Sequence, residues 1–344
     1  MGTAVSNLSL RFQNFRTVMK TRKPINLTAL TVVWLMGFTL GRAAAQPLQF
    51  TRLQRWTNGE IVLTLSAPTG RSHRVEASTD LITWHRLVTF PTNLTATLQH
   101  TDSAGPLLAA RFYRALPVLG TNIVSGDHLP TAEGDVVILP RNHATLVMQW
   151  NGKMIYCDPV STATYGGLPK ADLILVTHTH SDHFSTSTID AVRGPGCIIV
   201  GPAAVYTSLT AAQKLRAIVL TNNTSTNVLG MTVQAVPAYN SNHPLGTGNG
   251  YVLHIGGKRL YISGDTGNQP EVRALTNIDV AFLCMNQPWT MSVSAATNCV
   301  RAMQPRVVYP YHYRDQSGAT TNAATFKQWL GSESGIEVRL RPWY

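Results

Sequence analysis

Residues 173–183 constrain the fold and the chemistry of this chain more than any other part of the sequence. They read Leu-Ile-Leu-Val-Thr-His-Thr-His-Ser-Asp-His, an apolar strand that runs directly into a group of metal-binding side chains. Alternate residues of an extended chain point the same way, so His178 and His180 can hold one ion together. Asp182 and His183 follow where we expect a helix to begin, and they can turn toward a second ion. Three histidines and an aspartate within six residues after a buried strand argue against a solvated turn without function. Their nitrogen and oxygen atoms are ligands that suit zinc.

Beyond residue 130, strand-like and helix-like runs follow one another to the end of the chain. The strand-like runs come first in neighbouring pairs. They then alternate with helix-like stretches at about 186–193, 202–215, 269–276, 292–303 and 321–331. This order predicts an α/β fold built from packed layers.

The sequence resembles the metallo-β-lactamase superfamily, and the likeness continues downstream of the first motif. His243 lies in VPAYNSNHPLGTG, Asp265 lies in the Gly-Asp-Thr turn of RLYISGDTG, and His312 lies in PRVVYPYHYRD. Each is a motif position of that superfamily, and the likeness spans about residues 131–344. The resemblance implies a four-layer αββα fold and a metal-dependent hydrolase.

A finer resemblance is to the branch that contains L-ascorbate-phosphate lactonase and N-acyl-phosphatidylethanolamine phospholipase D. The residues that carry it are Asn142-His143-Ala144-Thr145, Asp158-Pro159-Val160 and the run MNQPWTMSVSAA before the last motif. That branch usually has glycine where this chain has Asn142, a departure that touches no ligand.

The superfamily pattern implies which side chains hold which ion. Three histidines hold the first ion: His178, His180 and His243. An aspartate and two histidines hold the second: Asp182, His183 and His312. Asp265 bridges both. Two divalent ions, zinc or alternatively manganese, would share a water and lower its pKa, and the bridging hydroxide would be the nucleophile. Asp182 can also accept a proton from that water, and His143 is either a catalytic residue of the pocket or a structural histidine.

The residue at position 265 also bears on the substrate. Superfamily members that open β-lactams generally lack an aspartate there, so the resemblance favours a small ester, lactone or phosphodiester. Polar side chains of the expected pocket loops would contact the substrate or only order the loops: Asn240, Asn286, Tyr313 and Arg314. Two alternatives are an inactive metal-binding surface protein and a nuclease. The complete ligand set argues against the first.

Residues 1–45 read as a secretory signal peptide. The positive Lys20, Arg22 and Lys23 precede an apolar run, and the alanines at 43–45 form a cleavage-site pattern before Gln46. We therefore expect a secreted or periplasmic protein, with an uncleaved membrane anchor as the alternative. The net charge is +11, but this leader holds six basic residues and no acid. The remaining +5 gives little reason to expect a nucleic-acid partner.

Residues 46–116 read as a small β-rich module and 117–130 as a linker to the hydrolase domain at 131–344. Short alternating runs such as EIVLTLS and SHRVEAS are separated by turn residues. The segment from VEASTDLITW to FYRAL resembles a module of secreted bacterial proteins. Histidines without ligand spacing are expected at the surface: His73, His85, His100 and His128. The four cysteines, which have no C-x-x-C pair among them, are expected to be buried free thiols.

Overall fold

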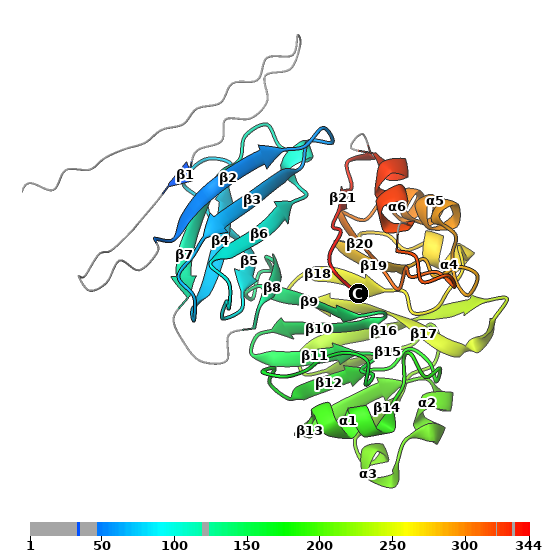
Figure 1. Ribbon diagram of the computed structural model, residues 1–344. Coiled ribbons are helices and arrows are strands. Elements are labelled where there is room, and N and C mark those ends of the chain that lie inside the picture. Colours follow the sequence, from blue (N-terminus) through cyan, green and yellow to red (C-terminus); the bar gives the residue numbers. More distant parts are fainter. Residues whose placement is uncertain (1–32, 35–46, 119–123, 321, 332–333) are drawn as a thin grey trace, which may run out of the picture.

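The computed structural model describes residues 33–34, 47–118, 124–320, 322–331 and 334–344 (Figure 1). The expected signal peptide therefore lies outside the described residues, except for the two-residue β1 (Val33–Trp34), which pairs in parallel with β7. No helix in the described part of the chain is long and apolar enough to cross a membrane.

The first sheet of the hydrolase region carries the first ligand motif at the end of a buried strand. Its strands, in spatial order, are β8 (Gly126–Leu129), β9 (Val136–Asn142), β10 (Thr145–Trp150), β11 (Lys153–Cys157), β12 (Ala171–Leu175), β13 (Arg193–Gly201) and β14 (Ala217–Val219). Neighbours from β8 to β11 are antiparallel, and those from β11 to β14 are parallel. Strand β12 is covered on both faces, which explains its unbroken apolar sequence.

The second sheet carries the other ligands. Its strands are β15 (Ser225–Val228), β16 (Met231–Asn240), β17 (His243–Ile255), β18 (Lys258–Ile262), β19 (Val280–Cys284), β20 (Val307–Tyr311) and β21 (Glu337–Val338). The strands from β15 to β18 form an antiparallel meander, and those from β18 to β21 are parallel neighbours.

Helices cover the outer faces of both sheets, so the region has the predicted four-layer αββα fold (Figure 1). Three helices lie against the first sheet: α1 (Thr186–Val192), α2 (Ala203–Ser208) and α3 (Ala211–Lys214). Three lie against the second: α4 (Pro270–Arg273), α5 (Val293–Met303) and α6 (Asn322–Leu330). The main core lies between the sheets and includes Leu146, Tyr251 and Phe282. The helix expected over 202–215 is divided, because Thr210 caps α3 through a capping box with Gln213.

The N-terminal region is all-β, as predicted, and has a core of its own. Strands β2 (Gln49–Arg55), β3 (Ile61–Ser66) and β6 (Thr97–Asp102) form a three-stranded sheet, with the short helix η1 (Gly105–Leu107) after β6. Strands β4 (Ser72–Ser78), β5 (His85–Phe90) and β7 (Phe112–Val118) form a second layer, and both layers bury apolar residues such as Leu63 and Val75.

Part of the expected linker is a strand. Strand β8, within 117–130, pairs with β5 of the module and with β9 of the hydrolase region. One continuous sheet therefore runs through both regions. Gly126 makes this close approach possible, because a Cβ there would lie 2.3 Å from the carbonyl oxygen of Ile138. The prediction of a linker rested on the shortness of this segment and on its turn-like sequence, which does not show the strand.

Three of the four histidines expected at the surface are buried, and only His85 is exposed. His100 lies on the same face of β6 as the buried Leu98 and Asp102, because residues two positions apart in a strand point the same way, and this face is turned inward. His128 contacts Thr89 and Asp135 through its two ring nitrogens, and His73 is also enclosed. The surface prediction was wrong for these three because it ignored strand alternation. The four cysteines are buried and unpaired, as expected.

Candidate metal centre

The seven predicted ligands converge on one end of the two sheets. The loop after β12 supplies His178, His180, Asp182 and His183, and the second sheet supplies His243, Asp265 and His312. His183 does not begin a helix as expected, since it lies in a turn and α1 starts only at Thr186.

Several residues at this edge have left-handed backbone conformations, including His143 (φ 56°), Asp158 (φ 47°) and His312 (φ 48°). Non-glycine residues adopt this region at a cost, and such residues cluster at functional sites. Backbone hydrogen bonds hold two of them in place. The N–H of His312 donates to the carbonyl of His143, and the N–H of His143 donates to the carbonyl of Trp343.

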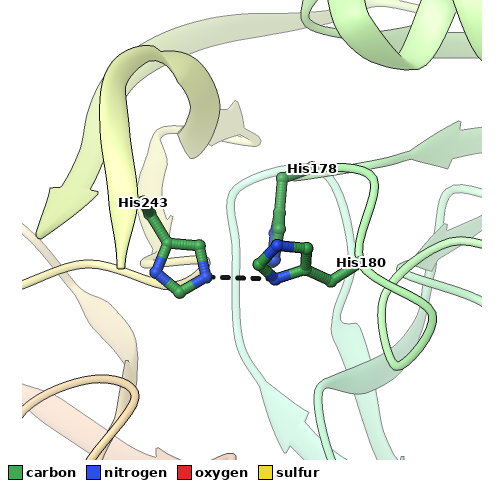
Figure 2. Close-up of side chains that lie close together, drawn as sticks. All are labelled: His178, His180 and His243. Atoms are coloured by element: carbon green, nitrogen blue, oxygen red, sulfur yellow. Dashed lines mark hydrogen bonds between the residues drawn. The ribbon is translucent and has the colours of Figure 1, made fainter. Parts of the chain in front are cut away.

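The first ligand group consists of His178, His180 and His243 (Figure 2). Their ligand atoms lie within 4.8 Å of one another, and Nε2 of His243 is 3.2 Å from Nδ1 of His180. Nε2 of His178 is buried and makes no hydrogen bond. The Oδ1 atom of Asn240 lies 2.9 Å from Nδ1 of His243 and can accept its proton, which leaves Nε2 free to bind an ion.

The second group consists of His183, His312 and Asp182. The Nε2 atoms of the two histidines are 3.0 Å apart, and Oδ2 of Asp182 lies 3.7 Å and 3.5 Å from them. His143 stands beside this group, with its Nε2 3.1 Å from Oδ2 of Asp182.

Asp265 faces both groups, each with a different oxygen. Oδ1 lies 3.3 Å from Nε2 of His183 and 3.3 Å from Nε2 of His312. Oδ2 lies 3.5 Å from Nε2 of His243 and 4.0 Å from Nε2 of His178. Oδ1 is buried and makes no hydrogen bond. A buried carboxylate oxygen without a donor is costly unless a cation completes its surroundings, so this arrangement fits bound metal.

Asp158 is a functional residue whose role the sequence did not predict. Its Oδ2 lies 2.8 Å from Nδ1 of His183, and its oxygens also accept hydrogen bonds from the backbone N–H and the hydroxyl of Thr177. A carboxylate behind a ligand histidine fixes the ring and its tautomer. Asp158-Pro159-Val160 was noted only as part of a family resemblance. The contact itself joins residues that are 25 positions apart.

Asn286 lies behind His312 in a comparable way. Its side-chain amide is 3.1 Å from Nδ1 of His312, while its Oδ1 is buried without a hydrogen bond. The oxygen and nitrogen of an amide are nearly equal in shape, so their assignment follows from their partners. With Oδ1 turned toward His312, the amide accepts from Nδ1–H and leaves Nε2 of the ring free for an ion.

Tyr344 is a second residue that sequence reasoning missed. Its Oη lies 2.9 Å from Nδ1 of His143, and the backbone N–H of Arg314 donates to that Oη at 3.1 Å. The guanidinium of Arg314 stacks over the Tyr344 ring at 4.0 Å. The hydroxyl proton of Tyr344 is therefore available to Nδ1 of His143, which directs the Nε2–H of that ring to Asp182.

Two of the four expected pocket residues therefore support ligand histidines. These are Asn240 and Asn286. Arg314 packs on Tyr344, and the hydroxyl of Tyr313 donates to the carbonyl of Arg341.

Electrostatics at the site favour a bound cation. Burial lowers the pKa of His178 well below its usual value. Burial also opposes protonation of His183, but the carboxylates of Asp265 and Asp158 outweigh it and raise the pKa of His183 well above its usual value. Asp265 and Asp182 likewise raise the pKa of His312 against burial. A metal ion bound between these groups would satisfy the same carboxylates, so its binding would compete with protonation of the two rings.

The site opens into a cavity of about 550 Å³. Its lining combines six of the residues described above with Asn242 and Trp289. The lining residues are His143, His180, Asp182, His243, Asp265, Asn242, Asn286 and Trp289. A space of this size accommodates a small organic molecule.

Comparison with known proteins identifies the family. The beta-lactamase superfamily domain matches residues 141–312, half of the chain and the whole span from the first ligand motif to the last. A metal-dependent hydrolase from Pyrococcus abyssi is 29% identical over 217 residues, which cover 58% of this chain and 94% of that protein. A second one, from Thermus thermophilus, is 29% identical over 207 residues, 57% of this chain and 91% of that protein.

Solved structures agree with this family and with the fold. The crystal structure of a metal-dependent hydrolase from Parabacteroides distasonis is 37% identical, with a TM-score of 0.58, and the match covers 64% of this chain and 99% of that one. A metallo hydrolase from the archaeon Ignicoccus hospitalis is 24% identical, with a TM-score of 0.53 over 60% of this chain and 94% of that one, and supports the fold alone. The chain belongs to the metallo-β-lactamase superfamily and is a metal-dependent hydrolase.

Proposed function

We propose that this chain uses two divalent metal ions, zinc or alternatively manganese, to hydrolyse a small ester, lactone or phosphodiester. The observation that carries the proposal is Asp265, whose two oxygens face the two ligand groups separately. An aspartate that served one ion would not need to direct its second oxygen to the other histidine group. Ions bound there would lower the pKa of a water toward neutrality and polarise the carbonyl or phosphoryl oxygen of the substrate.

The ligand residues would hold the two ions, and the residues behind them would hold the ligands. His178, His180 and His243 form one set. Asp182, His183 and His312, whose facing side-chain atoms lie within 3.7 Å of one another, form the other. Asp158, Asn240 and Asn286 engage the outer ring nitrogens of three of these histidines, so that the inner nitrogens keep their lone pairs.

Asp182 and His143 are suited to proton transfer. The side chain of Asp182 is partly exposed and lines the cavity, so its carboxylate can accept a proton from the attacking water. His143 also lines the cavity and contacts Oδ2 of Asp182 through Nε2. Burial lowers the pKa of His143, which keeps the ring neutral and lets Nε2–H orient the carboxylate. We assign His143 to this positioning of Asp182.

A test of the proposal combines metal content with turnover. The full chain is purified without metal, loaded with Zn²⁺ or Mn²⁺, and assayed on a generic ester, a lactone and a phosphodiester. The expected result is two ions per chain by elemental analysis and turnover of at least one substrate that disappears when the metal is removed. A chain that binds two ions and hydrolyses none of the three classes would contradict the proposal and favour an inactive metal-binding protein.

We also propose that the protein is exported from a bacterial cytoplasm. The proposal rests on the charged, apolar and alanine-rich order of residues 1–45. N-terminal sequencing of the exported protein should find a start at or near Gln46. An intact Met1 or Met19 would instead favour an uncleaved anchor.

A further inference from the structure

We infer that the substrate is an uncharged carboxylic ester or lactone whose apolar part lies against Trp289. This inference rests on the proposed hydrolase function and narrows its substrate class. It is carried by one exposed aromatic side chain at the cavity, by the way its backbone is held, and by the charge of the cavity lining.

Trp289 has a large, exposed apolar side chain at the cavity. It is 46% exposed, and it lines the same cavity as the ligands His180 and His243. Aromatic side chains in such positions supply a large apolar surface to a ligand. Burying that surface against the apolar part of a substrate would remove it from water and so stabilise the complex.

The loop that carries Trp289 is fixed on both sides. Asn240 and Asn242, from the end of β16 and the turn that leads to His243, donate side-chain hydrogen bonds to the carbonyl of Trp289 at 3.1 Å and 3.4 Å. Within the loop, the N–H of Thr290 donates to the carbonyl of Asn286 at 2.7 Å. Trp289 is thus tied to the segment that leads to the ligand His243, so its place relative to the reacting centre is preformed.

The cavity lining has no cationic side chain to meet a charged substrate. Among the described residues that line it there is no lysine or arginine, and the polar groups apart from the ligands and His143 are the amides of Asn242 and Asn286. Arg314 follows the ligand His312 by two positions, but its guanidinium stacks on Tyr344. Phosphate recognition usually employs arginine or lysine in addition to metal.

Asp182 and Asp265 also line the cavity, but the proposed function assigns both carboxylates to the ions. The oxygens of a phosphate group that did not bind the metal would therefore find only the amides of Asn242 and Asn286, and no cationic side chain. A neutral carboxylic ester or a lactone has no such oxygens, and its acyl or ring carbons match the indole.

The experiment compares two esters that share a leaving group and differ only in chain length. Zinc-loaded protein is assayed on p-nitrophenyl acetate, p-nitrophenyl hexanoate and bis(p-nitrophenyl) phosphate. The unmodified protein should favour hexanoate over acetate in kcat/KM by about 10-fold or more. The Trp289→Ala variant should lose most of this preference through a higher KM for hexanoate, with a much smaller loss of kcat/KM for acetate and with the zinc content of the unmodified protein.

Trp329→Ala is the matched control. Trp329 is 49% exposed on α6, similar to Trp289, and does not line the cavity. The inference is wrong if this control loses the hexanoate preference as fully as Trp289→Ala does. It is also wrong if the unmodified protein does not prefer hexanoate, or if it cleaves the phosphodiester with a higher kcat/KM than hexanoate.

A binding measurement separates this inference from the proposed function. If the zinc-loaded protein hydrolyses none of the three compounds, the proposed function fails on its own. Calorimetric titration with 2-octanone, a ketone of similar shape that is not hydrolysed, then decides the role of Trp289. Weaker binding by Trp289→Ala than by Trp329→Ala supports an apolar subsite, and equal binding by the two variants removes it.

Discussion

Asp127, near the junction with the N-terminal module, and Asp265, in the metal centre, are both almost fully buried, yet their surroundings differ in kind. Asp127 accepts hydrogen bonds from Nε of Arg341 at 2.7 Å and from the hydroxyl of Tyr309 at 2.8 Å, and Arg339 lies 4.0 Å away. The ionisable neighbours of Asp265 within 4 Å are histidines, and one of its oxygens makes no hydrogen bond.

The two clusters differ in whether the side chains around the aspartate can lose a proton. An arginine cannot lose its proton in a protein, so the Asp127 cluster is complete as it stands and serves packing. A histidine can release its proton and offer a lone pair, so the Asp265 cluster can exchange protons for metal ions. A buried aspartate surrounded by histidines, with an unpaired oxygen, therefore indicates a metal site more strongly than burial alone does. Four substitutions test this contrast: first two that act on metal binding, then two that act on stability, each pair in order of its expected effect.

Asp265→Asn should have the largest effect. An amide offers one good ligand oxygen and no charge, so metal content should fall from two ions toward one and the rate by about 100-fold or more. Elemental analysis and steady-state rates on the same preparation measure both. Asp127→Asn is the matched control, since it makes the same change at an equally buried aspartate that faces arginines. Two ions and full turnover in Asp265→Asn would refute the bridging role.

Asp158→Asn should have a smaller effect on the same site. Asp158 contacts a ligand histidine without facing the cavity, and loss of such a partner typically weakens metal affinity by about 10- to 100-fold. Competition with a chromogenic chelator measures the affinity. Asp135→Asn provides the control, because Asp135 contacts Nδ1 of His128 in a similar pair outside the metal centre. Equal metal affinities in the two variants would mean that Asp158 only packs the core.

Asp265 and Asp158 also show which parts of the site can be predicted from the sequence and which cannot. Asp265, His243 and His312 were predicted because each matches a short motif of the superfamily that the chain resembles. The motif at 178–183 stands out by its own residues, directly after an apolar strand. The layered fold was predictable for a related reason, since strand and helix periods are local properties. Each of these inferences needs only neighbouring residues.

The supporting contacts could not be predicted because they join distant parts of the chain. Asp158 and His183 are 25 positions apart, and His143 and Tyr344 are 201 positions apart. No spacing rule links such pairs before the sheets are assembled. The pairing of β5 with β8 was missed for the same reason, because two segments with no common motif meet only through the sheet.

Asp127→Asn should affect stability rather than chemistry. Arg339 and Arg341, against the effect of burial, lower the pKa of Asp127 to about 2. The amide would leave the buried Arg341 without its carboxylate partner, which typically costs about 3–5 kcal/mol, whereas Arg339 keeps its ion pair with Glu337. Urea unfolding of the metal-free protein should show this loss, while the folded variant keeps its ions and its turnover. A variant with unchanged stability, or one that loses metal while folded, would contradict the contrast between the two clusters.

His100→Gln should have the smallest effect and one that depends on pH. His100 is the counterpart of His183, because burial, aided by the nearby Arg341, lowers its pKa to about 4, whereas aspartates raise the pKa of His183. Between pH 6.5 and about 4 the unfolded chain therefore binds more protons at position 100 than the folded chain does. The stability that neutral His100 permits is fully present above pH 6.5 and is lost as the pH falls toward 4.

At pH 5 this loss amounts to about 2 kcal/mol, because the pH lies about 1.5 units below the unfolded pKa. Glutamine does not titrate, so the variant should lose less stability than the unmodified protein between pH 7.5 and pH 5. Urea unfolding of metal-free protein at the two pH values measures the difference, and the comparison cancels the titration of all other histidines. If both proteins lose the same stability, His100 is as easily protonated in the folded state as in the unfolded state. Burial beside Arg341 would then not keep the ring neutral, and the electrostatic contrast with the metal centre would be wrong.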